Sequence, residues 1–288
     1  MKEYKWSLRK SSRKEICPAC GQKRFVPYVL TSDGVTLAGS EFGRCDREQS
    51  CGYHRYPDGE VHAVVQSHKI APRKRLEYKG EINSMPTCDF YRYMQRVVGR
   101  LDAYVAIQDY KVDSIDNCII WWQIDRDGVV RTGKVMKYLP NGHRDKSDTF
   151  PVTWAHKHRR LKDLFVGEEL QQCLFGEHLL AANPEKPVAL VESEKTAVIM
   201  SRIFRQYLWL ATGGSQGIKS EDRLAVLSGR KVALFPDNGQ YYSWLRVAEK
   251  HGWSIWGGLE KKAPFEGCDI LDVFEHLFLK DYENEQSK

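Results

Sequence analysis

The stretch "PVALVESEKTAVIMSRIFRQ", residues 187–206, decides the fold class of the carboxyl-terminal third of the chain. It begins with a short apolar run, reaches Glu192, and continues with the periodicity of a helix. An apolar strand followed directly by a helix is typical of a parallel sheet that is covered on both faces. Ligands gather at the carboxyl ends of the strands in such sheets, so Glu192 stands where a functional group is expected.

The same pattern recurs further along the chain. "YLWLATGG" (207–214) and "KVALFPD" (231–237) predict two more strands that are followed by helices, and "SIWGGL" (254–259) predicts a short fourth strand. Acids follow three of the four strands, namely Glu192, Asp237, and the pair Asp269 and Asp272. Clustered carboxylates repel one another, which favours a bound divalent cation such as Mg²⁺ or Mn²⁺. For Asp269 taken singly, a helix cap is the alternative interpretation.

Four of the eight cysteines are bunched at Cys17, Cys20, Cys45 and Cys51, in a CxxC pair and a C-x5-C pair. The segment between the pairs predicts a hairpin with an "SDG" turn at 32–34. Four thiolates in this spacing predict a closed, structural zinc site that replaces a core too small to form by itself. His54 could replace Cys51 as the fourth ligand, and four free buried thiols are the remaining alternative.

Basic and aromatic residues surround this predicted zinc ribbon. Arg44, Arg47 and Arg55 are interleaved with Tyr53 and Tyr56, a composition that suits single-stranded nucleic acid. A solvated ribbon face is the alternative. Residues 1–80 hold 16 Lys and Arg against 9 Asp and Glu, whereas the whole chain has a net charge of +6. The positive excess is therefore amino-terminal and favours a phosphate-rich partner.

The segment "CIIWWQIDRDGVVRTGKVMKYLP" (118–140) predicts a β-hairpin around an "RDG" turn. On its second strand Arg131 and Lys137 share one face with Gly133, and Lys134 lies on the other face. These cations suit phosphate contacts, with simple solvation as the alternative. The predicted domain order is a basic tail (1–15), a zinc ribbon (16–58), a linker (59–86), an α+β subdomain (87–182) and the parallel-sheet domain (183–288).

"VALVESEKTAVIM", "LATGG", "VALFPDNG" and "CDILDVF" in this order resemble a Toprim domain, the catalytic fold of bacterial-type primases, topoisomerases and some nucleases. The preceding ribbon and hairpin resemble the zinc-binding and amino-terminal subdomains of bacterial and phage primases. "GRCDREQSCGYHRYP" and "QCLFGEHLL" more narrowly resemble an uncharacterised group of primase-like proteins on Bacteroidetes mobile elements. The resemblance implies that Glu192 is the general acid/base or a metal ligand, that Asp237 binds Mg²⁺, and that Arg131, Lys134 and Lys137 contact phosphates.

Two departures from the Toprim pattern separate the functional hypotheses. The second acid of the family's DxD motif is missing, because Gly239 follows Asp237 and Asn238, and Glu194 adds a charge to the first motif. The leading hypothesis is an α/β primase-like nucleotidyltransferase that acts on single-stranded DNA with nucleoside triphosphates. The alternatives are an inactive Toprim accessory protein that binds nucleic acid, and a Toprim nuclease.

The sequence also carries expectations about partners and location. It has no GxxxxGK[ST] motif, so unwinding would need a separate replicative helicase. No run approaches the ~20 apolar residues of a membrane span, and "MKEYKWSLRKSSRKE" lacks the apolar region of an export signal. We therefore expect a cytoplasmic protein.

Overall fold

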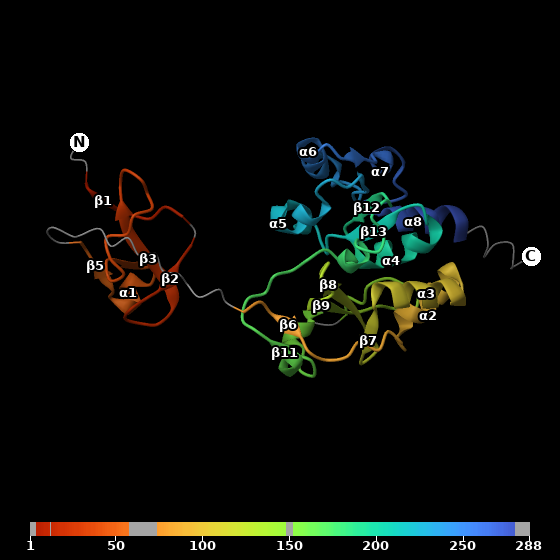
Figure 1. Ribbon diagram of the computed structural model, residues 1–288, viewed down its shortest axis with the longest axis horizontal. Coiled ribbons are helices and arrows are strands. Elements are labelled where there is room, and N and C mark those ends of the chain that lie inside the picture. Colours follow the sequence, from red (N-terminus) through yellow and green to blue (C-terminus); the bar gives the residue numbers. More distant parts are fainter. Residues whose placement is uncertain (1–3, 12, 58–73, 148–151, 280–288) are drawn as a thin grey trace, which may run out of the picture. The chain divides into compact units, whose positions relative to one another are not determined.

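The structure, a computed structural model, describes residues 4–11, 13–57, 74–147 and 152–279 of the 288-residue chain (Figure 1). The chain divides into two compact units, Met1–Pro72 and Arg73–Lys288. The boundary falls within the predicted linker, of which residues 59–73 lie outside the described residues. Among the described residues, no helix is both long and apolar enough to cross a membrane.

The first unit is an antiparallel sheet with a single helical turn. Its strands are β1 (Trp6–Leu8), β2 (Glu15–Ile16), β3 (Lys23–Leu30), β4 (Gly43–Cys45) and β5 (His54–Arg55), and α1 (Glu48–Cys51) precedes β5. The order is β1-β3-β4-β5, and β2 pairs with β3. The predicted turn is confirmed, since the Asp33 carboxylate accepts from the N–H groups of Val35 and Thr36. β1 lies in the segment predicted as a basic tail and extends the ribbon sheet by pairing with β3.

The second unit begins with a four-stranded antiparallel sheet that contains the predicted hairpin. The strands are β7 (Asp113–Ile115), β8 (Cys118–Ile124), β9 (Val130–Lys137) and β10 (Val152–Trp154), in the order β10-β9-β8-β7. Helices α2 (Asp89–Val98) and α3 (Arg100–Tyr110) pack on one face. The other face packs against β6 (Glu77–Tyr78), which pairs with β11 (Phe165–Val166), and against η1 (Ala155–Lys157); η2 (Lys162–Leu164) precedes β11. β6 and its buried Tyr78 thus lie within the segment predicted as a linker.

A parallel sheet forms the rest of the second unit, as the strand and helix pattern predicts. The strands β12 (Val188–Val191), β13 (Leu208–Ala211), β14 (Val232–Leu234) and β15 (Ser254–Ile255) lie in the order β13-β12-β14-β15. The α-helices are α4 (Glu194–Ile203), α5 (Glu221–Leu224), α6 (Tyr241–His251), α7 (Gly258–Lys262) and α8 (Ile270–Phe274). Shorter turns are η3 (Glu177–Leu179), η4 (Gly217–Lys219), η5 (Ala225–Leu227) and the π turn η6 (Glu275–Leu279).

Alternate residues of β12 explain why this sheet is covered on both faces. Ala189 and Val191 belong to one buried cluster together with α4, whereas Val188 and Leu190 belong to another together with α5 and α6. A continuous apolar strand is stable only when both of its faces are buried. The four-residue run "VALV" therefore requires the two helical layers that the structure shows.

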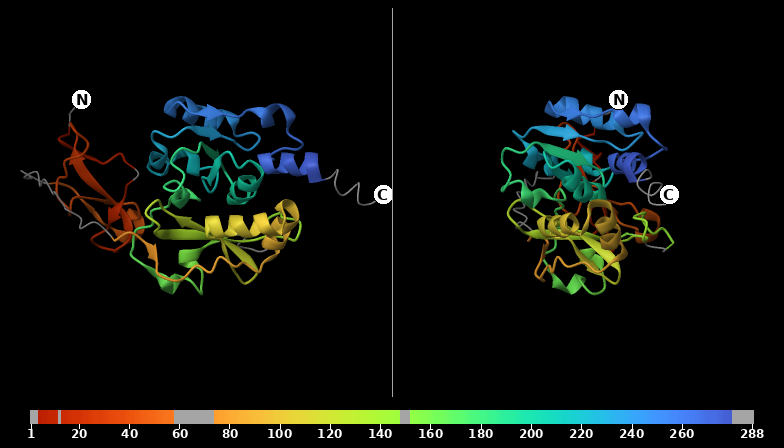
Figure 2. Two further views of the ribbon diagram at one scale, coloured as in Figure 1. Left: turned by 45° about the vertical axis from the view of Figure 1, so that its right-hand side comes forward. Right: turned by 90° about the vertical axis from the view of Figure 1, so that its right-hand side faces the viewer.

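The two sheets of the second unit share one hydrophobic core. Helices α2 and α3 pack against α4, so that they lie between the antiparallel sheet and the parallel-sheet layers (Figure 2). The Tyr110 hydroxyl donates to the Trp209 carbonyl at 2.7 Å, and Phe175 forms a β-bridge with Ala211. This packing fixes β9 beside the carboxyl ends of the parallel strands, where the predicted acids lie. This end of the sheet is called the carboxyl edge below.

Candidate functional site

The four predicted zinc ligands come together in the first unit. The sulfur atoms of Cys17, Cys20, Cys45 and Cys51 all lie within 4.8 Å of one another, and none is in a disulfide. The Cys17–Cys51 and Cys20–Cys45 sulfur distances are 3.7 and 4.0 Å. Tetrahedral zinc with Zn–S bonds of ~2.3 Å needs sulfur atoms about 3.8 Å apart. The cluster therefore fits a structural Zn²⁺ ion.

His54 is not positioned as the fourth ligand. Its Nδ1 lies 2.8 Å from the Glu48 carboxylate, and its Nε2 lies 3.1 Å from the Tyr28 hydroxyl. Both ring nitrogens are therefore occupied, whereas Cys51 lies within the sulfur cluster. Between the two alternatives that the sequence left open, the geometry selects Cys51.

The predicted nucleic-acid residues of the ribbon differ in their surroundings. Tyr53 packs edge-on against Phe25 and donates its hydroxyl to a backbone carbonyl, so it belongs to the ribbon core. The Tyr56 ring is exposed, and its centroid lies 4.1 Å from the centroid of the His54 ring.

The three predicted arginines of the ribbon lie at or near its surface. Arg44 pairs loosely with Glu48 at 3.9 Å, and Arg55 lies over the Phe42 ring at 5.4 Å. Arg47 is exposed at the start of α1. Cations beside an exposed aromatic ring form a surface on which a nucleobase can stack.

The carboxyl edge of the parallel sheet gathers the predicted acids. Burial raises the pKa of Asp237 to about 8, and the negative fields of Asp269, Glu192 and Asp272 add to this effect. Burial also raises the pKa of Glu192, against the opposing field of Lys134. The pKa of Asp272 is raised by burial and by Asp269. The four carboxylates thus act on one another, as expected for the meeting edge of parallel strands.

Asp269 and Asp272 are partly engaged in holding the start of α8. They form a capping box, in which each carboxylate accepts the backbone N–H of the other residue at 2.9 Å. The second oxygen of Asp269 accepts from the Thr196 hydroxyl. Both oxygens of Asp269 therefore accept a hydrogen bond, whereas one oxygen of Asp272 has no part in the capping box.

The acids of the edge are arranged more loosely than the cysteines. In the described part of the chain, the four cysteines are the one group of three or more candidate ligands that lie within 4.8 Å of one another. The donor set of the edge nevertheless suits Mg²⁺, which prefers a few carboxylate oxygens together with waters and phosphates. A divalent cation would also relieve the mutual repulsion that raises the pKa of Asp237.

Lys134 links the antiparallel sheet to this edge. Its ammonium lies 2.9 Å from one oxygen of Glu194 and donates to the other at 3.2 Å. It also donates to the Gly213 carbonyl. The side chains of Lys134 and Glu194 are only 12% and 4% exposed, so the pair is buried. Glu194, the additional acid in the first Toprim-like motif, thus forms an ion pair that joins β9 to the parallel-sheet region.

The other two predicted cations of β9 are also paired within the unit. Arg131 donates to Asp125 at 2.7 Å, and the Lys137 ammonium lies 3.0 Å from Asp145. The pairing of β8 with β9 shifts register at Arg131, so strand alternation does not fix the face of this residue. A phosphate group that contacts any of the three must therefore compete with a carboxylate.

Asn238 and Gly239 occupy the place of the missing acid. The Asn238 side chain donates to the Leu259 carbonyl and accepts from the Gly267 N–H, both at 3.2 Å. The Gly239 N–H donates to the Glu260 carboxylate at 2.9 Å. The sequence reasoning missed Glu260. Its signal is its position in the helix after β15, whose carboxyl end lies at the same edge.

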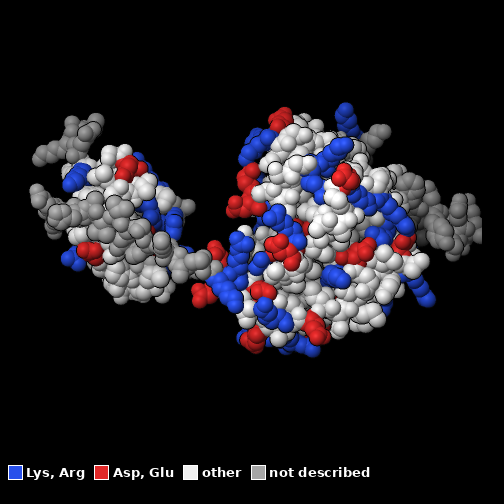
Figure 3. Space-filling model, viewed as in Figure 1, with Lys and Arg blue, Asp and Glu red and all other residues white. Residues whose placement is uncertain are grey.

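Charges are mixed over the second unit. On the face shown in Figure 3, Lys and Arg side chains gather between the positions of α5 and β6, with Asp and Glu side chains among them. The acids of the carboxyl edge are largely shielded from solvent by comparison, since Glu194 is buried and Glu192, Asp237 and Asp272 are half-buried.

The chain belongs to the family described as a domain of unknown function, DUF6371, whose model matches residues 88–238. A second model, described as a zinc beta-ribbon finger, matches residues 4–65. The matched regions correspond to the cysteine cluster and to most of the second unit. No curated protein matches the chain.

Solved primase structures are distantly similar to the chain. The primase fragment of the bacteriophage T7 primase-helicase has 17% identity and a TM-score of 0.39, over 64% of this chain and 69% of that one. The zinc-binding and RNA polymerase domains of the Aquifex aeolicus primase have 15% identity and a TM-score of 0.38, over 73% and 49%. The RNA polymerase domain of the Mycobacterium tuberculosis primase has 12% identity and a TM-score of 0.35, over 65% and 63%. At these values the likeness carries no inference about activity.

Proposed function

We propose that the chain is a primase-like nucleotidyltransferase that joins ribonucleotides on a single-stranded DNA template. The observation that carries the proposal is the presence of Glu192, Asp237 and Asp272 at one edge of the parallel sheet, where burial and, after it, the fields of the neighbouring acids raise the pKa of Asp237 to about 8. Burying acids whose fields also act on one another is costly for a purely structural surface. Perturbed carboxylates of this kind cluster at functional sites.

Each residue has a stated role in this proposal. Glu192, Asp237 and Asp272 would hold Mg²⁺, which neutralises charge on the phosphates during transfer. Glu192, which accepts a hydrogen bond from the Ser215 backbone and takes no part in the capping box of α8, takes the proton of the attacking hydroxyl. Lys134 keeps the loop after β13 in place through the Gly213 carbonyl.

The remaining partners follow from the charge distribution and the ribbon. Arg131 and Lys137 bind phosphates by exchanging their carboxylate partners, and the ribbon holds the template against Tyr56 and Arg55. We propose that this activity serves the replication of a mobile element or phage, with a separate helicase for unwinding.

The test is ribonucleotide incorporation on single-stranded DNA with Mg²⁺ or Mn²⁺. Template-dependent product is expected, and Glu192→Gln is expected to lower its rate by about 100-fold or more, because a proton acceptor is lost. Glu185→Gln removes an exposed acid before β12 and serves as the matched control. An equal rate for Glu192→Gln and the native protein contradicts the proposal, and cleavage of the DNA instead of synthesis identifies a nuclease.

A second candidate is favoured by Gly239, which stands where the Toprim pattern has an acid. In this alternative the chain binds nucleic acid without catalysis, as an accessory protein. Salt-sensitive binding of single-stranded DNA, with no product under either metal, identifies this function.

A further inference from the structure

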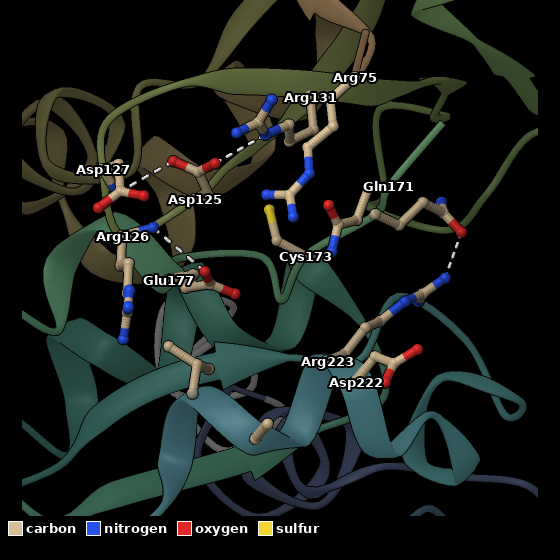
Figure 4. Close-up of a pocket in the computed structure, with 13 residues that line it drawn as sticks. Arg75, Asp125, Arg126, Asp127, Arg131, Gln171, Cys173, Glu177, Asp222 and Arg223 are labelled. Atoms are coloured by element: carbon tan, nitrogen blue, oxygen red, sulfur yellow. Dashed lines mark hydrogen bonds and ion pairs between the residues drawn. The ribbon is translucent and has the colours of Figure 1, made fainter. Parts of the chain in front are cut away.

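A cavity of about 320 Å³ lies beside the turn of the β8–β9 hairpin, within the second unit (Figure 4). Its walls come from four separate parts of the chain: the residues before β6, the hairpin turn, the segment 171–177, and the helices α5 and η5. Four arginines line it, namely Arg75, Arg126, Arg131 and Arg223. A volume of this size is in the range of small-molecule sites.

The two inner acids of the cavity are already engaged. Asp125 accepts from Arg131 at 2.7 Å and from two N–H groups of its own turn. Glu177 accepts the backbone N–H groups of Arg126 and Leu174, one at each oxygen, and burial raises its pKa. Asp125 is thus paired with Arg131, and the field of Glu177 acts on Arg126, so neither acid is paired with Arg223.

Arg223 is a half-buried cation that contacts only neutral groups. Its guanidinium donates to the Gln172 side chain and to the Thr212 carbonyl, and burial lowers its pKa. Within the described residues, no carboxylate forms an ion pair with Arg223, Arg75 or Arg126. A cation withdrawn from water without a counter-charge is costly, and a bound anion would remove that cost.

The other residues that line the cavity indicate that its ligand carries polar groups in addition to an anionic group. Cys173 and Val226 are also among the lining residues, and burial raises the pKa of the Cys173 thiol so that it stays neutral. Asp127 and Asp222 are exposed at the rim. Carboxylates at the rim can accept from hydroxyl or amino groups, and guanidinium groups match the geometry of phosphate.

We propose that this cavity, called here the arginine pocket, binds a nucleoside polyphosphate at a site separate from the carboxyl edge. Its phosphates contact Arg223 and Arg75, and its sugar or base faces the rim acids. The pocket adjoins the edge through one loop, because Thr212 accepts from Arg223 and the next residue, Gly213, accepts from Lys134. The inference does not depend on the proposed catalytic activity.

The test is the affinity of the full-length protein for ATP, measured by calorimetry without added divalent cation so that the carboxyl edge does not contribute. Arg223→Gln and Arg75→Gln are each expected to weaken binding about tenfold or more, because each removes a charge-assisted contact. Arg223→Lys is expected to recover part of the affinity. Arg75 is exposed, so its loss leaves the fold intact.

Two controls separate this site from the rest of the molecule. Arg205→Gln removes an exposed guanidinium that pairs with Asp102, outside the pocket, and is expected to bind ATP as the native protein does. Asp237→Asn is expected to have no effect on this binding. ATP affinity that is unchanged in both pocket variants, or lost in Asp237→Asn, overturns the proposal.

Inorganic pyrophosphate and adenosine identify which part of the ligand is recognised. ATP is expected to bind more tightly than either. Equal affinity for pyrophosphate and ATP overturns the nucleoside part of the assignment. Because no synthesis is measured, a protein that makes no primer and still loses ATP binding in Arg223→Gln leaves this inference standing and contradicts only the proposed function.

Discussion

The cysteine cluster and the carboxyl edge are two groups of metal-ligating side chains that the chain holds in different ways. The four sulfur atoms lie within 4.8 Å of one another, and the first unit has a small apolar cluster around them. The acids of the edge lie beside the large core of the second unit, and both oxygens of Asp269 already accept hydrogen bonds, from the backbone of α8 and from Thr196. The four sulfur atoms are close enough to enclose one zinc ion, whereas the acids of the edge are spread too widely to enclose an ion by themselves. The first arrangement is the one expected of a structural metal site, and an ion at the edge would need ligands from water or phosphate as well.

Removing one thiolate should have the largest effect. Cys45→Ser is expected to release zinc and unfold the first unit, because metal binding in such ribbons contributes on the order of 10 kcal/mol to folding. Zinc content and limited proteolysis measure this, and the fragment from residue 73 onward should resist cleavage. Cys118→Ser, in the second unit, is the control. Retention of zinc and structure by Cys45→Ser would show that the ribbon does not depend on the metal.

Breaking the buried ion pair at the edge should have the next largest effect. Lys134→Met leaves Glu194 buried without its cation, which is expected to cost about 3 kcal/mol of unfolding free energy. Urea denaturation measures this cost. The double variant Lys134→Met with Glu194→Gln is expected to recover much of it, since no charge is then left unpaired. Identical stability of the single and double variants contradicts the role of the pair.

The acids of the carboxyl edge should also make the free energy of unfolding depend on pH. The pKa of Asp237 is raised to about 8, so the folded protein holds a proton that the unfolded chain loses near pH 4. The resulting stabilisation is complete below pH 4 and is lost as the pH rises through 8. Between pH 6 and 8 we expect a decrease of roughly 1 to 2 kcal/mol that Asp237→Asn abolishes. Thermal melts in both proteins measure it, and a decrease that persists in Asp237→Asn assigns it to another group.

Restoring the missing acid should have the smallest effect on stability. Gly239 has φ +84°, and a Cβ added there meets no other atom within 4 Å. Gly239→Asp is therefore expected to cost about 1 kcal/mol through its backbone conformation alone, while it strengthens Mn²⁺ binding. Gly252→Asp, at a similar φ of +69° with open space, is the matched control and should leave Mn²⁺ binding unchanged. Equal Mn²⁺ affinity in both variants contradicts the view that position 239 faces the metal site.

Local patterns predicted the elements well and the partners of individual side chains poorly. The strand "VALV", the "RDG" turn and the cysteine spacing each depend on nearby residues, and the structure contains the elements they predict. The phosphate contact of Lys134 stays a prediction, and its pairing with Glu194 could not be read from a local pattern because it joins residues 60 positions apart in the chain. Tyr53 packs into the ribbon core because of a contact with Phe25 that composition does not reveal.

The strands β1 and β6 are further features that local sequence patterns do not predict. β1 lies in a basic segment, and β6 lies in a segment rich in Pro, Gly and charge, so neither has a strong pattern of its own. Both are strands because a distant strand, β3 or β11, offers them hydrogen-bond partners. Glu260 was missed for a related reason, since its contact with the Gly239 N–H depends on how the segment after β15 folds back.

The most direct test of the central claim, that the acids at the carboxyl edge form one cation site, is Mn²⁺ binding measured by electron paramagnetic resonance. The native protein is expected to bind Mn²⁺ in competition with Mg²⁺, and Asp237→Asn and Glu192→Gln are each expected to weaken this binding at least about tenfold. Glu185→Gln should bind as the native protein does. Unchanged Mn²⁺ affinity in both edge variants would contradict the account.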